Sequence, residues 1–140
     1  MITVRPTIAL LCAPLLTLGM AACGATTTVS TSAFKGEQQK VAQAVAHLQS
    51  HATALEAKKI CSEDLAAARV AQLNTAPGGC KKALESQLKQ IDSFETTVQS
   101  VQINGATATA HVKGVKGGKK SIQTLTLVHE GGKWKVSSLS

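Results

Sequence analysis

Aromatic residues are scarce in this 140-residue sequence, which has two Phe, one Trp and no Tyr. A folded core must therefore be built from Val, Leu, Ile and Ala. The chain has a formal net charge of +7, but its most basic run, at residues 113–120, contains no aromatic residue, whereas surfaces for single-stranded nucleic acids combine basic and aromatic side chains. A nucleophile elbow, a phosphate-binding loop and a nucleotide fingerprint are also missing. We therefore expect no catalytic residue, no cofactor and no nucleic-acid partner.

The first 22 residues have the anatomy of a signal peptide. A short positive start that includes Arg5 precedes an apolar stretch from Ile8 to Leu18, which is short for a membrane span. Small residues then lead into Met20-Ala21-Ala22-Cys23, which resembles the bacterial lipobox, with Met in place of its usual Leu. We expect cleavage before Cys23 and lipidation of its thiol, with palmitate among the acyl chains. Ordinary secretion with cleavage just after this Cys is the alternative.

The stretch after Cys23 is small and rich in hydroxyl groups, and it lacks the periodicity of a helix or strand. We interpret residues 23–35 as the lipidated Cys and a flexible tether, and residues 36–140 as one domain. Ten extended residues reach at most about 35 Å. The domain is therefore expected at the extracytoplasmic face of the cell membrane, held there by its N-terminal lipid.

Two cysteines belong to the domain. Cys12 leaves with the signal peptide and Cys23 takes the lipid, so Cys61 and Cys80 remain as an even pair in an oxidising compartment. A disulfide between them would close a loop of about 20 residues and stabilise the fold by roughly 3 kcal/mol. The alternative is a metal or redox pair, which usually requires closer spacing or a CxxC motif. We predict a structural disulfide and no metal site.

Three helices are expected in the first part of the domain. Residues 36–58 place Val and Leu at helical spacing along one face. Ser62 is a candidate cap for a second helix that runs to about Leu73, with Glu63 and Asp64 in its first turn. The turn signal at residues 74–79 ends it, and a third helix is predicted over about 80–92.

In the second part of the domain, apolar residues recur at every second position, which is typical of strands. Asn104-Gly105 and Gly131-Gly132 are hairpin signals, and a basic loop is expected from Gly114 to Lys120. The strands predicted between these turns cover about 96–103, 106–112, 121–130 and 133–138. Helices followed by such a meander indicate an α+β fold, in which the helices pack on one face of a curved antiparallel sheet.

Residues 101–110, together with the late pattern Glu130-Gly131-Gly132-x-Trp134-x-Val136, resemble small bacterial lipoproteins of the nuclear-transport-factor-two-like superfamily. The resemblance implies a cystatin-like cone. It says little about activity, because the superfamily holds isomerases, dehydratases and non-catalytic modules. Its enzymes place Asp, His or Tyr inside the cone. Here Tyr is absent, and Asp64 and Asp92 are expected at helix ends, so the resemblance favours a protein that is not an enzyme.

The four histidines are candidates for chemistry. His47 and His51 share one side of the first helix at a spacing that can hold a metal, but no carboxylate accompanies them in a protease-like motif. We therefore interpret both as exposed. His111 and His129 lie on strands and could approach each other across the sheet, at its surface or at a pocket rim. Trp134 is expected to anchor the core rather than to bind a ligand.

Lys113, Lys116, Lys119 and Lys120 form the most basic run of the chain, and we call them the hairpin lysines. One interpretation is contact with an anionic surface, either lipid headgroups or wall polymer. The alternative is a solvated hairpin whose charges keep the protein soluble.

Three functions are compatible with these features. The preferred one is a membrane-anchored, non-catalytic module that binds another protein of the cell envelope or a small apolar partner. The alternative is a carrier that holds a small apolar ligand or lipid in the cone. An isomerase- or dehydratase-like enzyme is the third. The inward-facing residues separate them: a roomy apolar pocket favours the carrier, a filled core favours the interaction module, and a buried Asp or His in a cleft favours the enzyme.

Overall fold

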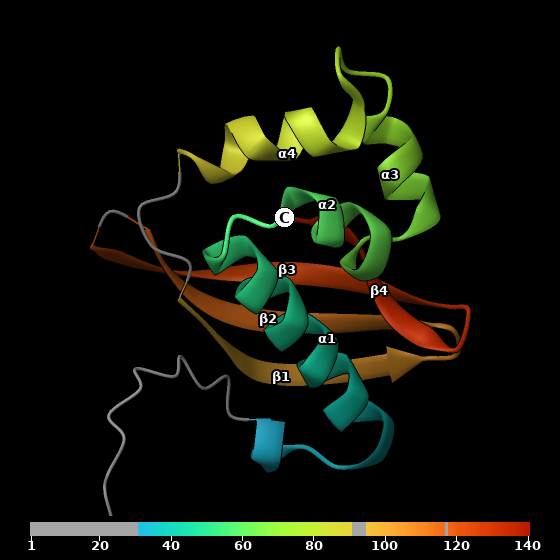
Figure 1. Ribbon diagram of the computed structural model, residues 1–140. Coiled ribbons are helices and arrows are strands. Elements are labelled where there is room, and N and C mark those ends of the chain that lie inside the picture. The colour runs from blue at the N-terminus through green and yellow to red at the C-terminus, as the bar shows by residue number, and fades with distance from the viewer. Residues whose placement is uncertain (1–30, 91–94, 117) are drawn as a thin grey trace, which may run out of the picture.

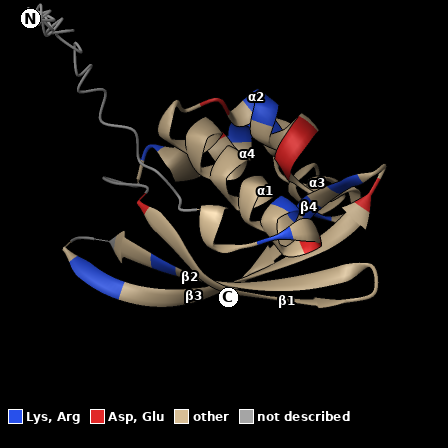
Figure 2. Ribbon diagram, turned by 90° about the horizontal axis from the view of Figure 1, so that it is seen from below, with Lys and Arg blue, Asp and Glu red and all other residues tan. Residues whose placement is uncertain are grey.

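A four-stranded antiparallel sheet forms one layer of the protein, and the helices cover one face of it (Figure 1, Figure 2). The computed structural model describes residues 31–90, 95–116 and 118–140. Its elements in chain order are the 3-10 turn η1 (Thr31–Ala33), α1 (Gly36–Thr53), α2 (Ala57–Lys59), the π-helical turn η2 (Ile60–Asp64), α3 (Ala67–Leu73), α4 (Gly79–Leu88), β1 (Thr96–Asn104), β2 (Thr107–Lys116), β3 (Lys119–Glu130) and β4 (Lys133–Leu139). The predicted α+β class is confirmed, with the helices on one face of a curved sheet.

The strands follow one another in the order β1-β2-β3-β4. Asn104 pairs with Thr107, so the first hairpin turns at Gly105 and Ala106, one residue later than predicted. Gly105 has a φ of 60°, which a two-residue turn with Gly at its first central position requires. The predicted Gly131-Gly132 turn is confirmed, because Glu130 pairs with Lys133 across it.

The predicted basic loop from Gly114 to Lys120 is wrong. β2 continues to Lys116 and β3 begins at Lys119, and the backbone register runs unbroken from one to the other. Gly and Lys are poor strand formers by propensity, but pairing with a neighbouring strand outweighs that preference. Three of the hairpin lysines, Lys113, Lys119 and Lys120, are exposed on this extended hairpin.

The first helix ends five residues earlier than predicted. Leu55 adopts a φ of 56°, the left-handed conformation that usually terminates helices at Gly. The amides of Leu55 and Glu56 donate to the carbonyls of Ala52 (3.1 Å) and His51 (2.8 Å), which completes a Schellman-type cap. Leu55, predicted on the buried face, is 58% exposed.

The predicted helix start at Ser62 is also wrong. The Ser62 hydroxyl donates to the Lys59 carbonyl instead of capping a new helix. Leu65 then forms a parallel bridge with Val136 of β4, and the Ala66 amide donates to the Val136 carbonyl at 2.8 Å. The chain is therefore extended here, and α3 begins only at Ala67. Its end at Leu73 agrees with the prediction.

Cys61 and Cys80 form the predicted disulfide, with their Cα atoms 6.2 Å apart. It joins η2 to the first turn of α4. The Cys80 amide also donates to the Asn74 side chain at 2.9 Å, which closes the turn before α4. α4 ends at Leu88, and residues 91–92 of the predicted helix lie outside the described residues.

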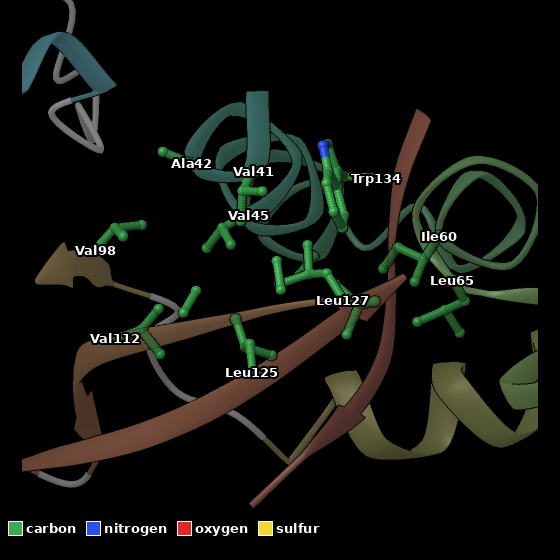
Figure 3. Packing of buried hydrophobic residues seen from close by; sticks show 14 of the residues in the cluster. Val41, Ala42, Val45, Ile60, Leu65, Val98, Val112, Leu125, Leu127 and Trp134 are labelled. Atoms are coloured by element: carbon green, nitrogen blue, oxygen red, sulfur yellow. The ribbon is translucent and has the colours of Figure 1, made fainter. Parts of the chain in front are cut away.

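The main core lies between α1 and the sheet. Figure 3 shows Val41 and Val45 of α1 above Val112, Leu125 and Leu127 of the sheet, all of them buried. This packing follows from the apolar stripe of the helix and from the strand alternation that points every second side chain inward. Residues 1–30, which include the predicted signal peptide and Cys23, lie outside the described residues. Within the described part of the chain, no helix is both long and apolar enough to cross a membrane.

Candidate functional site

A cavity of about 170 Å³ opens between the helices and the sheet, beside the main core. Its walls come from α1, η2, α3 and α4 on one side and from all four strands on the other. The residues that line it are mostly aliphatic: Val45, Leu48, Ala52, Ile60, Leu65, Arg69, Leu73, Leu84, Gln87, Leu88, Thr96, Val112, Gln123, Leu125, Val136, Ser137, Ser138 and Leu139.

Ordinary periodicity directs these side chains into the cavity. Val45, Leu48 and Ala52 are three, four or seven residues apart on α1 and therefore share one face. Val112 and Leu125 lie on neighbouring strands at positions that alternate inward. The apolar patterns that predict the elements therefore also predict most of the lining.

The mouth of the cavity is marked by the lining residues that solvent reaches. Gln87 of α4 and Ser138 of β4 are exposed, and Leu139 is 58% exposed. Arg69 of α3, another lining residue, is half-buried and so partly reached by solvent, and its Nη1 donates to Gln72 Oε1 at 3.2 Å. The cavity thus has an aliphatic interior and a mixed, partly polar entrance.

The size and chemistry of the cavity suit a small apolar group. An apolar cavity of roughly 150 Å³ in another protein stays dry and binds benzene, so this one suits a compact apolar group. Among the described lining residues there is no aromatic ring, no carboxylate, no His and no Cys. A ligand in this cavity would be held mainly by shape and by exclusion from water, because most of the lining is aliphatic.

A second hollow, the polar cleft, lies outside the apolar cavity. It measures about 310 Å³ and is lined by Lys40, Gln43, Ala44, His47, Glu63, Asp64, Gly132, Lys133 and Trp134. Trp134 is buried, which confirms its predicted role as a core anchor, and its Nε1 donates to Glu37 Oε2 at 3.0 Å. Hydrogen bonds from Lys40 and Trp134 lower the pKa of the Glu37 carboxyl.

Asp64 and His51 form a pair that the sequence did not indicate. Asp64 is buried rather than placed in a helix start, and its Oδ2 lies 2.7 Å from Nδ1 of His51. His51 is therefore not the exposed residue predicted, whereas His47 is exposed. Burial raises the pKa of the Asp64 carboxyl, and the hydrogen bond with His51 opposes that rise. Because Nε2 of His51 also lies 4.0 Å from Glu56 Oε2, both ring nitrogens face carboxylates.

The other histidines do not meet. His111 pairs with Thr124, and its Nδ1 lies 3.3 Å from the Thr124 hydroxyl. His129 pairs with Trp134 near the opposite end of β3, with ring centroids 5.0 Å apart. The expected approach of the two histidines is wrong, because the register separates them. Among the described residues, no group of three or more His, Cys, Asp or Glu side chains could hold a metal.

The lysines of the β2–β3 hairpin lie away from the cavity. Blue segments in Figure 2 mark lysines near this end of the sheet, and none of Lys113, Lys119 and Lys120 is among the described residues that line either hollow. Asp92 and Phe94 lie outside the described residues.

Helices over one face of a curved antiparallel sheet, with an apolar cavity between the layers, define a nuclear-transport-factor-two-like α+β domain. The chain belongs to the family described as "Putative lumazine-binding", whose model matches residues 49–139. No curated protein and no solved structure matches the chain. The match extends from the last five residues of α1 through β4 and so includes most of the cavity lining.

Proposed function

We propose that this protein is a non-catalytic carrier that binds a small apolar ligand in the cavity between α1, α3, α4 and the sheet. The observation that carries the proposal is the cavity itself: an aliphatic interior of about 170 Å³ that opens at Leu139. The family description adds support, because it points to small-ligand binding as well.

Two other functions have less support. A protein-interaction module would be expected to have a filled core, whereas this domain keeps an apolar space between its layers. A buried Asp or His in a cleft is the feature that would favour an enzyme, and Asp64, which is buried, lines the polar cleft together with His47. Neither Asp64 nor His51 lines the apolar cavity, and both nitrogens of His51 already face carboxylates. This pair therefore has a structural role in the proposal.

The pteridine suggested by the family description is a second candidate ligand. Planar heterocycles usually stack on aromatic rings and form several hydrogen bonds. Because the described lining is aliphatic, we expect an aliphatic ligand to bind more tightly than lumazine.

Calorimetric titration with 1-octanol tests the proposal. The Cys23→Ala protein, purified without detergent, should bind this alcohol saturably and with one site. Ala52→Leu fills part of the cavity from the buried face of α1 and should weaken binding by roughly tenfold, since a few methylenes change affinity by about 1.4 kcal/mol. Ala71→Leu places the same side chain on the exposed face of α3 and should leave the affinity unchanged.

Two results would count against the carrier. One is the absence of saturable binding in a protein whose cooperative thermal unfolding shows that it is folded. The other is equal weakening in the Ala52→Leu and Ala71→Leu variants. If Ala52→Leu does not fold, Leu139→Ser at the exposed mouth replaces it, and a smaller loss of affinity is expected.

We also propose that a lipid on Cys23 anchors the protein at the extracytoplasmic face of the membrane. The sequence motif Met20-Ala21-Ala22-Cys23 supports this localisation. Cys23→Ala should move the protein from the membrane fraction to the soluble fraction, because two or three acyl chains bind a bilayer far more firmly than none. A wild-type protein that is soluble without detergent in its host would contradict the anchor.

The hairpin lysines are proposed to contact an anionic surface near that anchor. Each Lys close to anionic lipid contributes about 1 kcal/mol at low salt. Replacing all four by Gln should abolish most binding of the Cys23→Ala protein to vesicles that contain phosphatidylserine. Equal binding to neutral vesicles, or no effect of the replacements, would favour the solvated hairpin instead.

A further inference from the structure

Arg69 is the one charged residue among the described residues that line the apolar cavity. It lies on α3, half-buried, and lines the same cavity as the exposed residues Gln87 and Ser138 that mark the mouth. Among the described residues, no carboxylate lies within ion-pair distance of its guanidinium. Its recorded side-chain partner is the neutral Gln72, which accepts from Nη1 at 3.2 Å.

Arg69 brings a cation to an otherwise uncharged lining, and the described residues give it no carboxylate partner. A guanidinium has five N–H donors, and the contact with Gln72 uses one of them. Its planar fork matches the two oxygens of a carboxylate, and the apolar wall beside it strengthens the attraction by lowering the local dielectric. The cavity wall therefore offers one cationic partner for an anion beside an aliphatic interior that can accept a chain.

We propose that Arg69 binds the anionic head group of the ligand, and that the preferred ligands are aliphatic monocarboxylates whose chain enters the cavity. The inference rests on the proposed function and specifies its ligand class. A six-carbon ring fills a cavity of roughly 150 Å³ in another protein, so a chain of about six to eight carbons fits the space here. The hydroxyl of Ser138 and the amide of Gln87 are further polar groups at the mouth.

Three probes with the same eight-carbon chain separate the contributions of the head and the chain. Octanoate, 1-octanol and octylammonium are titrated by calorimetry into the Cys23→Ala protein at neutral pH. Octanoate should bind about 3- to 10-fold more tightly than octanol, the range expected of a partly exposed ion pair. Octylammonium should bind more weakly than octanol, because its charge repels that of Arg69.

Arg69→Gln should remove the preference for octanoate while it leaves octanol binding within about twofold. Lys58→Gln removes the same charge at an exposed position of α2 that does not line the cavity, and it should leave the preference intact. Added salt should weaken octanoate binding and spare octanol binding. Because Arg69 is half-exposed and pairs only with Gln72, its replacement should not unfold the domain.

The outcomes distinguish this inference from the proposed function. If octanol and octanoate bind with equal affinity, or if Arg69→Gln and Lys58→Gln have the same effect, the assignment of Arg69 is overturned and the carrier stands. If octylammonium is the tightest of the three probes, the cavity prefers cations and the inference is also overturned. If none of the probes binds to the folded protein, both the carrier and the role of Arg69 are overturned.

Discussion

The two layers that enclose the cavity are held together in different ways. The sheet is a continuous ladder, in which each strand is hydrogen-bonded to the next through short hairpins. The helical layer, from α1 to α4, is held by the apolar core beneath α1 and by separate contacts between segments distant in the sequence. These contacts include the Cys61–Cys80 disulfide, the His51–Asp64 pair, the bridge from Leu65 to Val136, and the hydrogen bond from the Ala67 amide to Glu130.

Because of this difference, we expect the helical side of the cavity to change shape more easily than the sheet side. Strand pairing fixes the positions of Val112 and Leu125 on the floor, because every neighbouring residue is part of the ladder. The opposite wall, with Leu73 and Leu88, is positioned through the disulfide and the turns around it. We therefore expect changes in the sheet to affect global stability, and changes in the helical contacts to affect the cavity first.

The largest effect is expected in the sheet. Leu127 is fully buried at the centre of β3 and does not line the cavity. Leu127→Ala should lower the free energy of unfolding by about 2–5 kcal/mol, through lost burial and the void it leaves. Leu139→Ala, at a position 58% exposed, should cost less than about 0.5 kcal/mol. Urea denaturation measures both, and similar losses in the two variants would contradict the assignment of the core.

Removal of the disulfide should have the next largest effect. The Cys61→Ser/Cys80→Ser protein should lose about 3 kcal/mol of stability, because the unfolded chain regains the freedom of the open loop. Hydrogen exchange should quicken in α3 and α4 while β2 and β3 stay protected. A reductant should reproduce the effect in the wild type and change nothing in the variant. An equal loss of protection from hydrogen exchange in the helices and in the sheet would contradict the proposed difference between the two layers.

A gain in stability is expected at the end of α1. Leu55→Gly should stabilise the fold by about 1 kcal/mol, because Gly adopts the left-handed conformation without the cost that a Cβ atom imposes. Ser50→Gly places the same residue at an exposed helical position of α1 and should destabilise by up to about 0.5 kcal/mol, because Gly is a poorer helix former than Ser. Thermal unfolding distinguishes the two variants, because the melting temperature should rise for Leu55→Gly and fall for Ser50→Gly. Destabilisation by both substitutions would contradict the left-handed conformation of Leu55.

The smallest effect concerns the pH dependence of stability. Burial raises the folded-state pKa of Asp64 above its ordinary value of 3.8, so the folded protein holds this proton more tightly than the unfolded chain. The protonated carboxyl therefore makes its full contribution to the free energy of unfolding below pH 3.8. That contribution is lost as the pH rises through the higher pKa of the folded state.

Asp64→Asn removes this titration and keeps an oxygen that can accept from His51. Denaturation of both proteins at a series of pH values from 3 upward should show the wild type losing stability relative to the variant. A wild type that gains stability relative to Asp64→Asn over the same interval would mean that the carboxylate is stabilised, not penalised, by its surroundings.

The strands were predictable because their signals are local. Alternation of apolar residues and the Gly131-Gly132 turn placed β3 and β4 to within a few residues. The helical layer was harder, because its boundaries depend on partners far along the chain. Asp64 looks like a helix-start residue until the fold brings it to His51, and residues 65–66 extend only because Val136 of β4 is there to pair with them.

The cavity was only half predictable for the same reason. Its aliphatic lining follows from the apolar faces of α1 and of the strands. Its mouth does not, since Arg69, Gln87 and Ser138 come from three separate elements and follow no shared motif. A charged residue on an otherwise neutral face of α3 was the available signal for Arg69, but nothing in the sequence places it beside a cavity.

Methyl-resolved NMR during titration of the Cys23→Ala protein with 1-octanol tests the central claim most directly. The account predicts saturable shifts at the methyl groups of Leu48, Leu73 and Leu125, which line the cavity from α1, α3 and β3. Val41 and Val101 are buried outside it and should shift little. Shifts that grow without saturation, or that are as large at Val41 and Val101 as at the lining residues, would contradict a ligand-binding cavity between the two layers.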